Sequence, residues 1–282
     1  MPAAFNPNGK QILPSGYKAG GGAPQFENPP LEFFDVGKGS SARRLAFRRR
    51  CGAGPGVVWL GGFKSDMLST KAARLDEWAA RAGRAFLRFD YSGHGGSSGS
   101  FEAGTIGQWL EESVAAARQL TSGPQIVVGS SMGGWIALLA ARELARLGEA
   151  DRLAGMVLIA PAVDFTEALM WDRMSPDVQR EIIEQGRWMR PTQYAPEPYA
   201  ITRELIEEGR GHLLMGDLIR AHCPVHILQG ILDPDVPWRH AMELVHRLAY
   251  DPVSVSMVRD GDHRLSREED IALLISCVER IA

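Results

Sequence analysis

The fold of this chain is decided by the stretch Gln125-Ile126-Val127-Val128-Gly129-Ser130-Ser131-Met132-Gly133-Gly134-Trp135. An apolar, β-branched run leads directly into Gly-x-Ser-x-Gly, and a helical pattern follows at once. This order is typical of a nucleophile elbow, in which a strand ends, the chain turns sharply and a serine hydroxyl is exposed at the apex. The sequence therefore predicts that Ser131 is a nucleophile and that the helix N-terminus after it offers free N–H groups to an oxyanion.

The same stretch has an alternative interpretation as an ordinary glycine-rich turn between a strand and a helix, including one that holds a phosphate. The phosphate-binding pattern requires Gly-Lys-Ser or Gly-Lys-Thr, and this stretch contains no lysine. Because Gly-x-Ser-x-Gly alone is not specific, a catalytic role for Ser131 depends on finding a base and an acid elsewhere in the chain.

Apolar strand patterns and amphipathic helix patterns alternate along residues 31–160 and again along residues 222–282. The alternation predicts an α/β fold with a mostly parallel sheet that is covered by helices on both faces. We expect strands at 31–36, 43–49, 56–60, 85–90, the run before Gly129, 153–160, 225–229 and 253–258. We expect helices at 69–82, 105–120, from the elbow to about 147, 237–248 and 266–281. Residues 1–30 are rich in glycine and proline, which predicts a flexible N-terminal arm.

Residues 161–221 interrupt the alternation. They contain short helical patterns at 176–185, 202–208 and 212–219 and no clear strand. The segment is rich in adaptable apolar side chains, namely Met170, Trp171, Met174, Trp188, Met189 and Tyr194. We interpret it as a helical cap inserted above the carboxyl ends of the strands, where open α/β sheets bind ligands. A large loop excursion with its own small core is the alternative.

The net charge of −3 gives no electrostatic reason to expect a nucleic-acid partner. No apolar run approaches the ~18 residues of a membrane span. The N-terminus has the pattern of neither a secretory signal nor a mitochondrial transit peptide. Three widely spaced cysteines, Cys51, Cys223 and Cys277, fit neither a disulfide framework nor a metal site. We therefore expect a cytoplasmic protein that needs no metal and no cofactor.

A serine hydroxyl becomes a good nucleophile only when a base accepts its proton, and a buried carboxylate usually holds that base. Of the seven histidines, His263 is the one on a loop directly after the last predicted strand. Asp233 follows the penultimate strand, where the acid of such a triad belongs. Asp235, two residues later, is the competing candidate, and Asp262 adjoins His263 with a side chain that should diverge from it. We predict a triad of Ser131, Asp233 and His263.

An oxyanion hole should complete the site. One expected donor is the backbone N–H of Met132, which directly follows the nucleophile, and the other comes from the loop after an earlier strand. Here that loop is Gly61-Gly62-Phe63. Its glycines allow the backbone to approach a ligand, so we predict the N–H of Phe63 as the second donor.

Several of these motifs resemble those of α/β-hydrolases with an inserted cap. Asp90-Tyr91-Ser92-Gly93-His94-Gly95-Gly96-Ser97 is similar to the family's D-x-x-G-x-G-x-S loop, and Gly230-Ile231-Leu232-Asp233-Pro234-Asp235-Val236-Pro237 is similar to G-x-x-D-x-x-V-P. The resemblance implies that Asp233 is the triad acid and that Asp90 is structural. Arg88-Phe89-Asp90-Tyr91-Ser92-Gly93, the elbow, Val236-Pro237-Trp238 and Asp262-His263-Arg264 resemble one branch in particular. It is the tenth α/β-hydrolase-domain type, which comprises acyl-protein thioesterases and acyl-glucuronide esterases with bacterial relatives.

The first functional hypothesis is a serine hydrolase that cleaves carboxylic esters or thioesters, on a small molecule or an acylated protein, through an acyl-enzyme. A peptidase or a carbon–carbon bond hydrolase on the same fold is a second hypothesis. A third is a non-catalytic protein that uses the pocket to bind a ligand. A haloalkane dehalogenase is disfavoured because it needs a carboxylate at the elbow.

Overall fold

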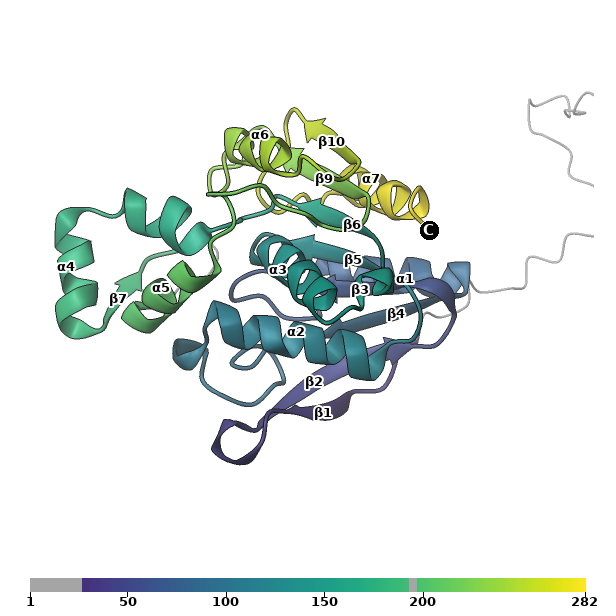
Figure 1. The fold of residues 1–282 in the computed structure, drawn as a ribbon, viewed down its shortest axis with the longest axis horizontal. Coiled ribbons are helices and arrows are strands. Elements are labelled where there is room, and N and C mark those ends of the chain that lie inside the picture. Colours follow the sequence, from purple (N-terminus) through teal and green to yellow (C-terminus); the bar gives the residue numbers. More distant parts are fainter. Residues whose placement is uncertain (1–26, 193–196) are drawn as a thin grey trace, which may run out of the picture.

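The computed structural model describes residues 27–192 and 197–282 (Figure 1). Of the flexible arm predicted at residues 1–30, the part at 1–26 lies outside the described residues, and residues 27–30 form neither helix nor strand. No helix in the described ranges is both long enough and apolar enough to cross a bilayer.

The core is an eight-stranded sheet with the spatial order β1-β2-β4-β3-β5-β6-β9-β10. β2 is antiparallel to both β1 and β4, and the remaining neighbours are parallel. The strands are β1 (Glu32–Val36), β2 (Arg43–Arg50), β3 (Ala53–Leu60), β4 (Arg84–Phe89), β5 (Gln125–Ser130), β6 (Leu153–Ile159), β9 (Val225–Gly230) and β10 (Val253–Val258). The predicted α/β-hydrolase fold is confirmed, and the eight predicted strands agree with these bounds to within a few residues.

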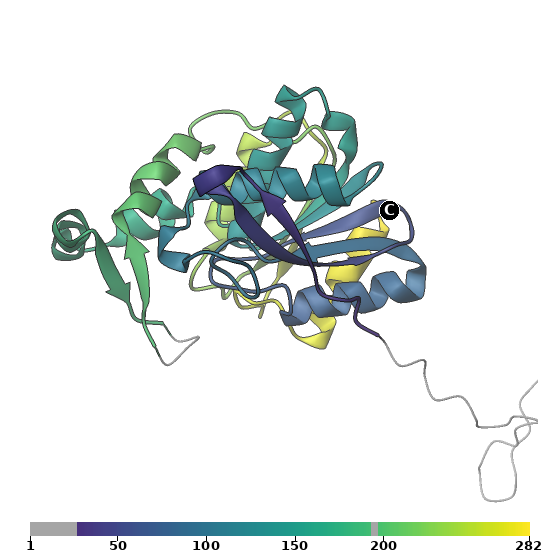
Figure 2. The same cartoon turned by 90° about the horizontal axis from the view of Figure 1, so that it is seen from below.

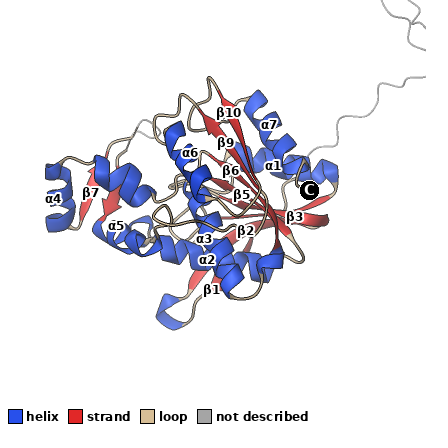
Figure 3. Cartoon of the chain, turned by 45° about the horizontal axis from the view of Figure 1, so that its top comes forward, coloured by secondary structure: helices blue, strands red, loops and turns tan. Residues whose placement is uncertain are grey.

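Helices cover both faces of this sheet (Figure 3). One face packs against α2, α3 and α6, and the other face packs against α1 and α7. Their bounds are α1 (Thr70–Ala82), α2 (Ile106–Leu120), α3 (Met132–Arg146), α6 (Trp238–Arg247) and α7 (Glu268–Glu279). All five begin and end close to the residues predicted from helical periodicity.

The central strands are buried on both sides, as expected for parallel strands between two helical layers. Side chains of β3 alternate between the layers: Val58 and Leu60 join the apolar cluster that includes Ile136 of α3, whereas Val57 packs in the cluster that includes Leu75 of α1. This two-sided burial fixes where β3 and β5 end, and the loops that follow them carry the candidate site.

The segment between β6 and β9 lies to one side of the sheet (Figures 1 and 2). It contains the short helical segments η4 (Phe165–Met170), η5 (Trp171–Arg173) and η6 (Arg210–His212), the helices α4 (Pro176–Gln185) and α5 (Arg203–Gly209), and the strands β7 (Arg187–Arg190) and β8 (Tyr199–Thr202). Glu208 of α5 accepts hydrogen bonds from the N–H of Gly107 at 3.0 and 3.2 Å. This carboxylate attaches the segment to the N-terminus of α2.

Two expectations for this segment are wrong. A clear strand was not expected, but β7 and β8 pair as an antiparallel two-stranded sheet. A helix was expected at 212–219, but the chain turns there without forming one. The carboxylate of Asp164 accepts the N–H groups of Leu214 and Met215 at 2.9 and 2.8 Å. The N–H of Ile219, which would bond to the carbonyl of Met215 in a helix, donates instead to the carbonyl of Arg247 at 2.8 Å.

Candidate active site

Ser131 sits in a sharp turn between β5 and α3. Its φ of 54° and ψ of −117° lie outside the regions that side chains favour, a conformation that costs about 1–3 kcal/mol. Two backbone hydrogen bonds hold the turn: the N–H of Ser131 donates to the carbonyl of Ile159 at 2.8 Å, and the N–H of Ala162 donates to the carbonyl of Ser131 at 3.1 Å. A Cβ on Gly129 would collide with the carbonyl of Gly133. The end of β5 and the start of α3 therefore approach each other closely at this glycine.

The structure brings Ser131, His263 and Asp233 together. Nε2 of His263 lies 3.0 Å from Oγ of Ser131, and Nδ1 of His263 lies 2.8 Å from Oδ2 of Asp233. The side chain of Asp233 is 0% exposed. Its Oδ1 accepts the N–H groups of Asp235 and Val236 at 2.8 and 2.9 Å. Because these donors occupy one carboxylate oxygen, the other oxygen is aimed at the histidine ring.

The two competing carboxylates have other positions. Asp235 contributes its backbone N–H to Asp233, and Oδ1 of Asp262 accepts the N–H groups of Arg264 and Leu265 at 3.1 and 3.0 Å. Asp262 thus shapes the turn after the histidine, and the carboxylate at Nδ1 of His263 belongs to Asp233.

Asp233, Asp235 and His263 also form a group that could hold a metal ion, because their potential ligand atoms lie within 4.8 Å of one another. Two of the three already bond to each other: Nδ1 of His263 meets Oδ2 of Asp233. Metal binding through these atoms would break the pair that orients the ring toward Ser131, so the hydrogen-bonded arrangement accounts for the cluster.

Phe63 and Met132 lie beside the serine. Both line the same cavity as Ser131. Met132 is the first residue of α3, and a Cβ placed on Gly62 would stand 3.4 Å from Cβ of Ser131, so the backbone before Phe63 passes next to the nucleophile. Within the described residues, neither the N–H of Phe63 nor that of Met132 donates a hydrogen bond to another group. Both N–H groups therefore belong to residues that line the cavity beside Ser131 and lack an acceptor among the described residues.

A cavity of about 750 Å³ opens above Ser131. Phe165, Leu169 and Met170 of η4 form an apolar side, and Lys64, Lys71 and Arg190 are among the polar residues around it. Of the apolar residues singled out in the segment 161–221, Met170 lines this cavity, and Trp171, Met174 and Trp188 pack against the main apolar cluster. Tyr194 lies outside the described residues.

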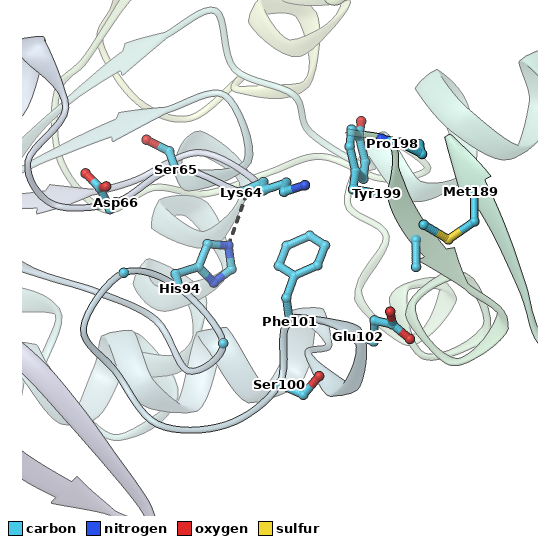
Figure 4. A pocket seen from close by; sticks show the side chains of 13 residues that line it. Lys64, Ser65, Asp66, His94, Ser100, Phe101, Glu102, Met189, Pro198 and Tyr199 are labelled. Carbon is cyan, nitrogen blue, oxygen red and sulfur yellow. Dashed lines mark hydrogen bonds between the residues drawn. The ribbon is translucent and has the colours of Figure 1, made fainter. Parts of the chain in front are cut away.

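A second cavity of about 360 Å³ adjoins the first and shares Lys64, Ser65 and Tyr199 with it. It lies between the loops after β3 and β4 and the strands β7 and β8, and Met189 is on its far side (Figure 4). The amine of Lys64 stands 4.9 Å from the centre of the Tyr199 ring, a distance that allows a cation–π interaction. Both residues line both cavities.

Sequence reasoning missed Lys71, which lines the larger cavity from α1. Lys71 is 9% exposed. Its amine donates to the carbonyl of Arg264 and lies 3.4 Å from Oγ of Ser266. Burial lowers the pKa of Lys71 from 10.5 to about 8, against the nearby charge of Asp262. One signal was available, because Lys71 precedes Leu75 by four residues and therefore shares its buried helix face.

Known proteins resemble this chain over most of its length. The mouse "Palmitoyl-protein thioesterase ABHD10, mitochondrial" is 34% identical over 241 residues, which are 85% of this chain and 79% of that protein. The crystal structure of a putative hydrolase from Agrobacterium vitis S4 is 46% identical, with a TM-score of 0.85 over 89% of this chain and 99% of the other. The structure of α/β-hydrolase domain-containing protein 10 from mouse is 32% identical, with a TM-score of 0.79 over 89% and 98% of the two chains.

These relatives correct one expectation. A cytoplasmic location was expected, but the curated relatives from mouse, cattle and human are named as mitochondrial proteins. The expectation of a cytoplasmic protein is therefore wrong. Its basis was the spacing of three cysteines and the pattern of the first residues. Unpaired cysteines indicate a reducing environment, which does not specify one compartment.

The comparisons agree with the geometry of the fold. A sequence model described as "Alpha/beta hydrolase family" matches residues 52–273, which include Ser131, Asp233 and His263. The relatives confirm the resemblance to the tenth α/β-hydrolase-domain type. With this match over most of its length and the sheet order already described, the chain belongs to the α/β-hydrolase family.

Proposed function

We propose that this protein is a serine hydrolase that cleaves carboxylic esters or thioesters through an acyl-enzyme. The observation that carries the proposal is the continuous hydrogen-bond chain from Oγ of Ser131 through the ring of His263 to the buried carboxylate of Asp233, with distances of 3.0 and 2.8 Å. A carboxylate only accepts hydrogen bonds, so Nδ1 of His263 carries the proton and Nε2 is left as the acceptor for the serine hydroxyl.

In the proposed mechanism, Oγ of Ser131 attacks the acyl carbonyl while its proton passes to Nε2 of His263. Asp233 orients the ring and stabilises the imidazolium. The N–H groups of Phe63 and Met132 donate to the oxyanion of the tetrahedral intermediate. His263 then returns the proton to the departing alcohol or thiol. Water activated by His263 hydrolyses the acyl-enzyme and restores the free serine.

For the substrate, we propose that residues 161–221 act as a cap and that the acyl chain lies along its apolar side. Phe165, Leu169 and Met170 supply that side within the cavity of about 750 Å³, a volume within the usual range for ligand pockets. The relatives named palmitoyl-protein thioesterases support an acyl substrate. The leaving group then faces the polar side of the cavity, near Lys64 and Arg190.

The test compares Ser131→Ala with Ser122→Ala on p-nitrophenyl esters and acyl thioesters of increasing chain length. Ser122 is an exposed serine in the loop before β5 and serves as the matched control. We expect the first variant to lose at least about 10³-fold in kcat, since removal of a triad member typically costs more than this, and the control to match wild type. A fluorophosphonate probe should label Ser131 in the folded wild-type protein.

Other results would redirect the proposal. Turnover by Ser131→Ala at the wild-type rate would refute it. Preferential cleavage of aminoacyl amides would indicate a peptidase, and preferential cleavage of a β-diketone would indicate a carbon–carbon bond hydrolase. Absence of both turnover and labelling in folded protein would favour a ligand-binding protein.

A further inference from the structure

The loop that carries Phe63 is attached to the glycine loop after β4. The backbone N–H of Lys64 donates to Nε2 of His94 at 3.1 Å (Figure 4). Three residues further along, the N–H of Met67 donates to Oδ1 of Asp90 at 2.6 Å. The loop after β4 therefore contacts the loop after β3 at two points through side-chain acceptors.

The ring of His94 is in a defined protonation state. Its Nδ1 lies 3.1 Å from the carbonyl oxygen of Ser92, and a carbonyl can only accept, so Nδ1 carries the proton and Nε2 is the acceptor for Lys64. Tyr91, Phe101 and Trp109 surround the ring at centroid distances of 5.8, 5.3 and 5.3 Å. Burial lowers the pKa of His94 below its ordinary value, which favours the neutral ring that this bond needs.

The bond falls in a tight turn. The N–H of Ser65 donates to the carbonyl of Gly62 at 3.1 Å, so Phe63 and Lys64 are the two central residues of the turn. Lys64 has a φ of 59°, a conformation in which glycine or asparagine is preferred at this position. The hydrogen bond to His94 fixes the central peptide of the turn. The adjoining peptide, which joins Gly62 to Phe63, carries the proposed oxyanion donor beside Ser131.

We propose that His94 is a positioning residue for the oxyanion hole: by accepting the N–H of Lys64, it holds the N–H of Phe63 toward the acyl carbonyl. The inference rests on the proposed function, because Phe63 matters as a donor only if Ser131 forms a tetrahedral intermediate. His94 itself does not line the larger cavity that contains Ser131. Its influence on catalysis should therefore act through the loop and appear in kcat.

The two nitrogens of His94 can be separated by substitution. In His94→Asn, the side-chain amide can still donate to the carbonyl of Ser92, but no acceptor reaches Lys64. In His94→Gln, the longer side chain can place an acceptor near the position of Nε2, and the donor to Ser92 is lost. Because loss of a whole oxyanion donor costs about 10²–10³-fold in kcat, we expect a misplaced donor in His94→Asn to cost about 10–100-fold. His94→Gln should stay within about 5-fold of wild type.

The assay measures kcat and KM for one activated ester and the inhibition constant of a trifluoromethyl ketone, whose adduct with Ser131 carries an oxyanion. For His94→Asn we expect KM within about 3-fold of wild type and weaker binding of the ketone by the factor lost in kcat/KM. Equal losses in the two variants, or a loss confined to KM, would show that His94 only packs the loop. Ser131→Ala tests the proposed function separately. Full activity in that variant would refute the proposed function. An inactive Ser131→Ala, together with equal kcat values for His94→Asn and His94→Gln, would refute only the positioning role of His94.

The comparison of His94→Asn with His94→Gln can be repeated in a Lys64→Gly background, in which the turn is less strained. Lys64→Gly keeps the N–H and accepts a positive φ without strain, so the turn depends less on its hydrogen bond. Both His94 variants should fold in this background if they fail to fold with Lys64 in place. The difference in kcat between His94→Asn and His94→Gln should be smaller there. A difference as large as in the Lys64 background, or no difference in either background, would contradict the positioning role.

Discussion

Replacing Asp233 by asparagine should inactivate the enzyme by changing the tautomer of His263. In the structure, Oδ1 of Asp233 accepts two backbone N–H groups, from Asp235 and Val236. An asparagine at this position must keep its oxygen there, since its NH₂ group would face two donors. The NH₂ group therefore takes the place of Oδ2, 2.8 Å from Nδ1 of His263.

Facing an NH₂ group, Nδ1 of His263 can only accept a hydrogen bond, so the ring proton moves to Nε2. Nε2 lies 3.0 Å from Oγ of Ser131 and, once protonated, cannot take the serine proton. The same inversion in a serine protease lowers kcat by about 10⁴-fold. We expect kcat for Asp233→Asn to fall by about 10³–10⁴-fold, with a much smaller change in KM.

The assay is steady-state hydrolysis of a short-chain p-nitrophenyl ester, with thermal unfolding as a check that both variants are folded. Asp235→Asn is the matched control: it makes the same change two residues away, and the backbone N–H that supports Asp233 remains. We expect this control to keep kcat within about 10-fold of wild type. The assignment of Asp233 as the acid would be refuted if kcat of Asp233→Asn stayed within about 10-fold of wild type. It would also be refuted if Asp235→Asn lost more kcat than Asp233→Asn.

Two further predictions concern stability. Gly129→Ala should lower the free energy of unfolding in urea by about 2 kcal/mol or more, because the added Cβ meets the backbone of Gly133, which cannot move without displacing α3. In the control Gly216→Ala the added Cβ has open space, and the free energy of unfolding should change by less than about 0.5 kcal/mol. Equal effects of the two substitutions would contradict the close packing of the elbow. The pKa of Lys71 lies near 8 in the folded chain against 10.5 ordinarily. Between these pH values the unfolded chain holds a proton that the folded chain has lost. The free energy of unfolding should therefore increase as pH rises from about 8 to 10.5. Wild type minus Lys71→Met isolates this contribution, and a flat difference over that range would show that Lys71 titrates normally.

The parts of the site that could be predicted from sequence are those set by local patterns. The elbow can be recognised because a β-branched run, Gly129, Ser131 and Gly133 specify a strand, a turn and a helix within a few residues. Asp233 and His263 follow strands that are themselves recognisable, and parallel strands bring their carboxyl ends to one edge of the sheet. Their geometry in the structure agrees with the prediction.

The parts that could not be predicted depend on contacts between distant segments. The bond from Lys64 to His94 joins two loops, and nothing in either loop's composition specifies that contact. The turn at 212–219 has an apolar pattern that favours a helix, but the N–H of Ile219 donates to the carbonyl of Arg247 in a distant segment. In both cases the local conformation depends on a hydrogen bond between distant segments.

The sheet order explains why the two halves of the site can be perturbed separately. β4 and β3 lie on one side of β5, and their loops carry His94 and Phe63; β6, β9 and β10 lie on the other side, and the loops after β9 and β10 carry Asp233 and His263. Ser131, at the end of β5, therefore lies between the loop that carries Phe63 on one side and the loops that carry Asp233 and His263 on the other. A change at His94 should therefore lower kcat without disturbing the hydrogen bonds of His263 to Asp233 and Ser131. A change at Asp233 should alter those hydrogen bonds and leave the turn at Lys64 in place.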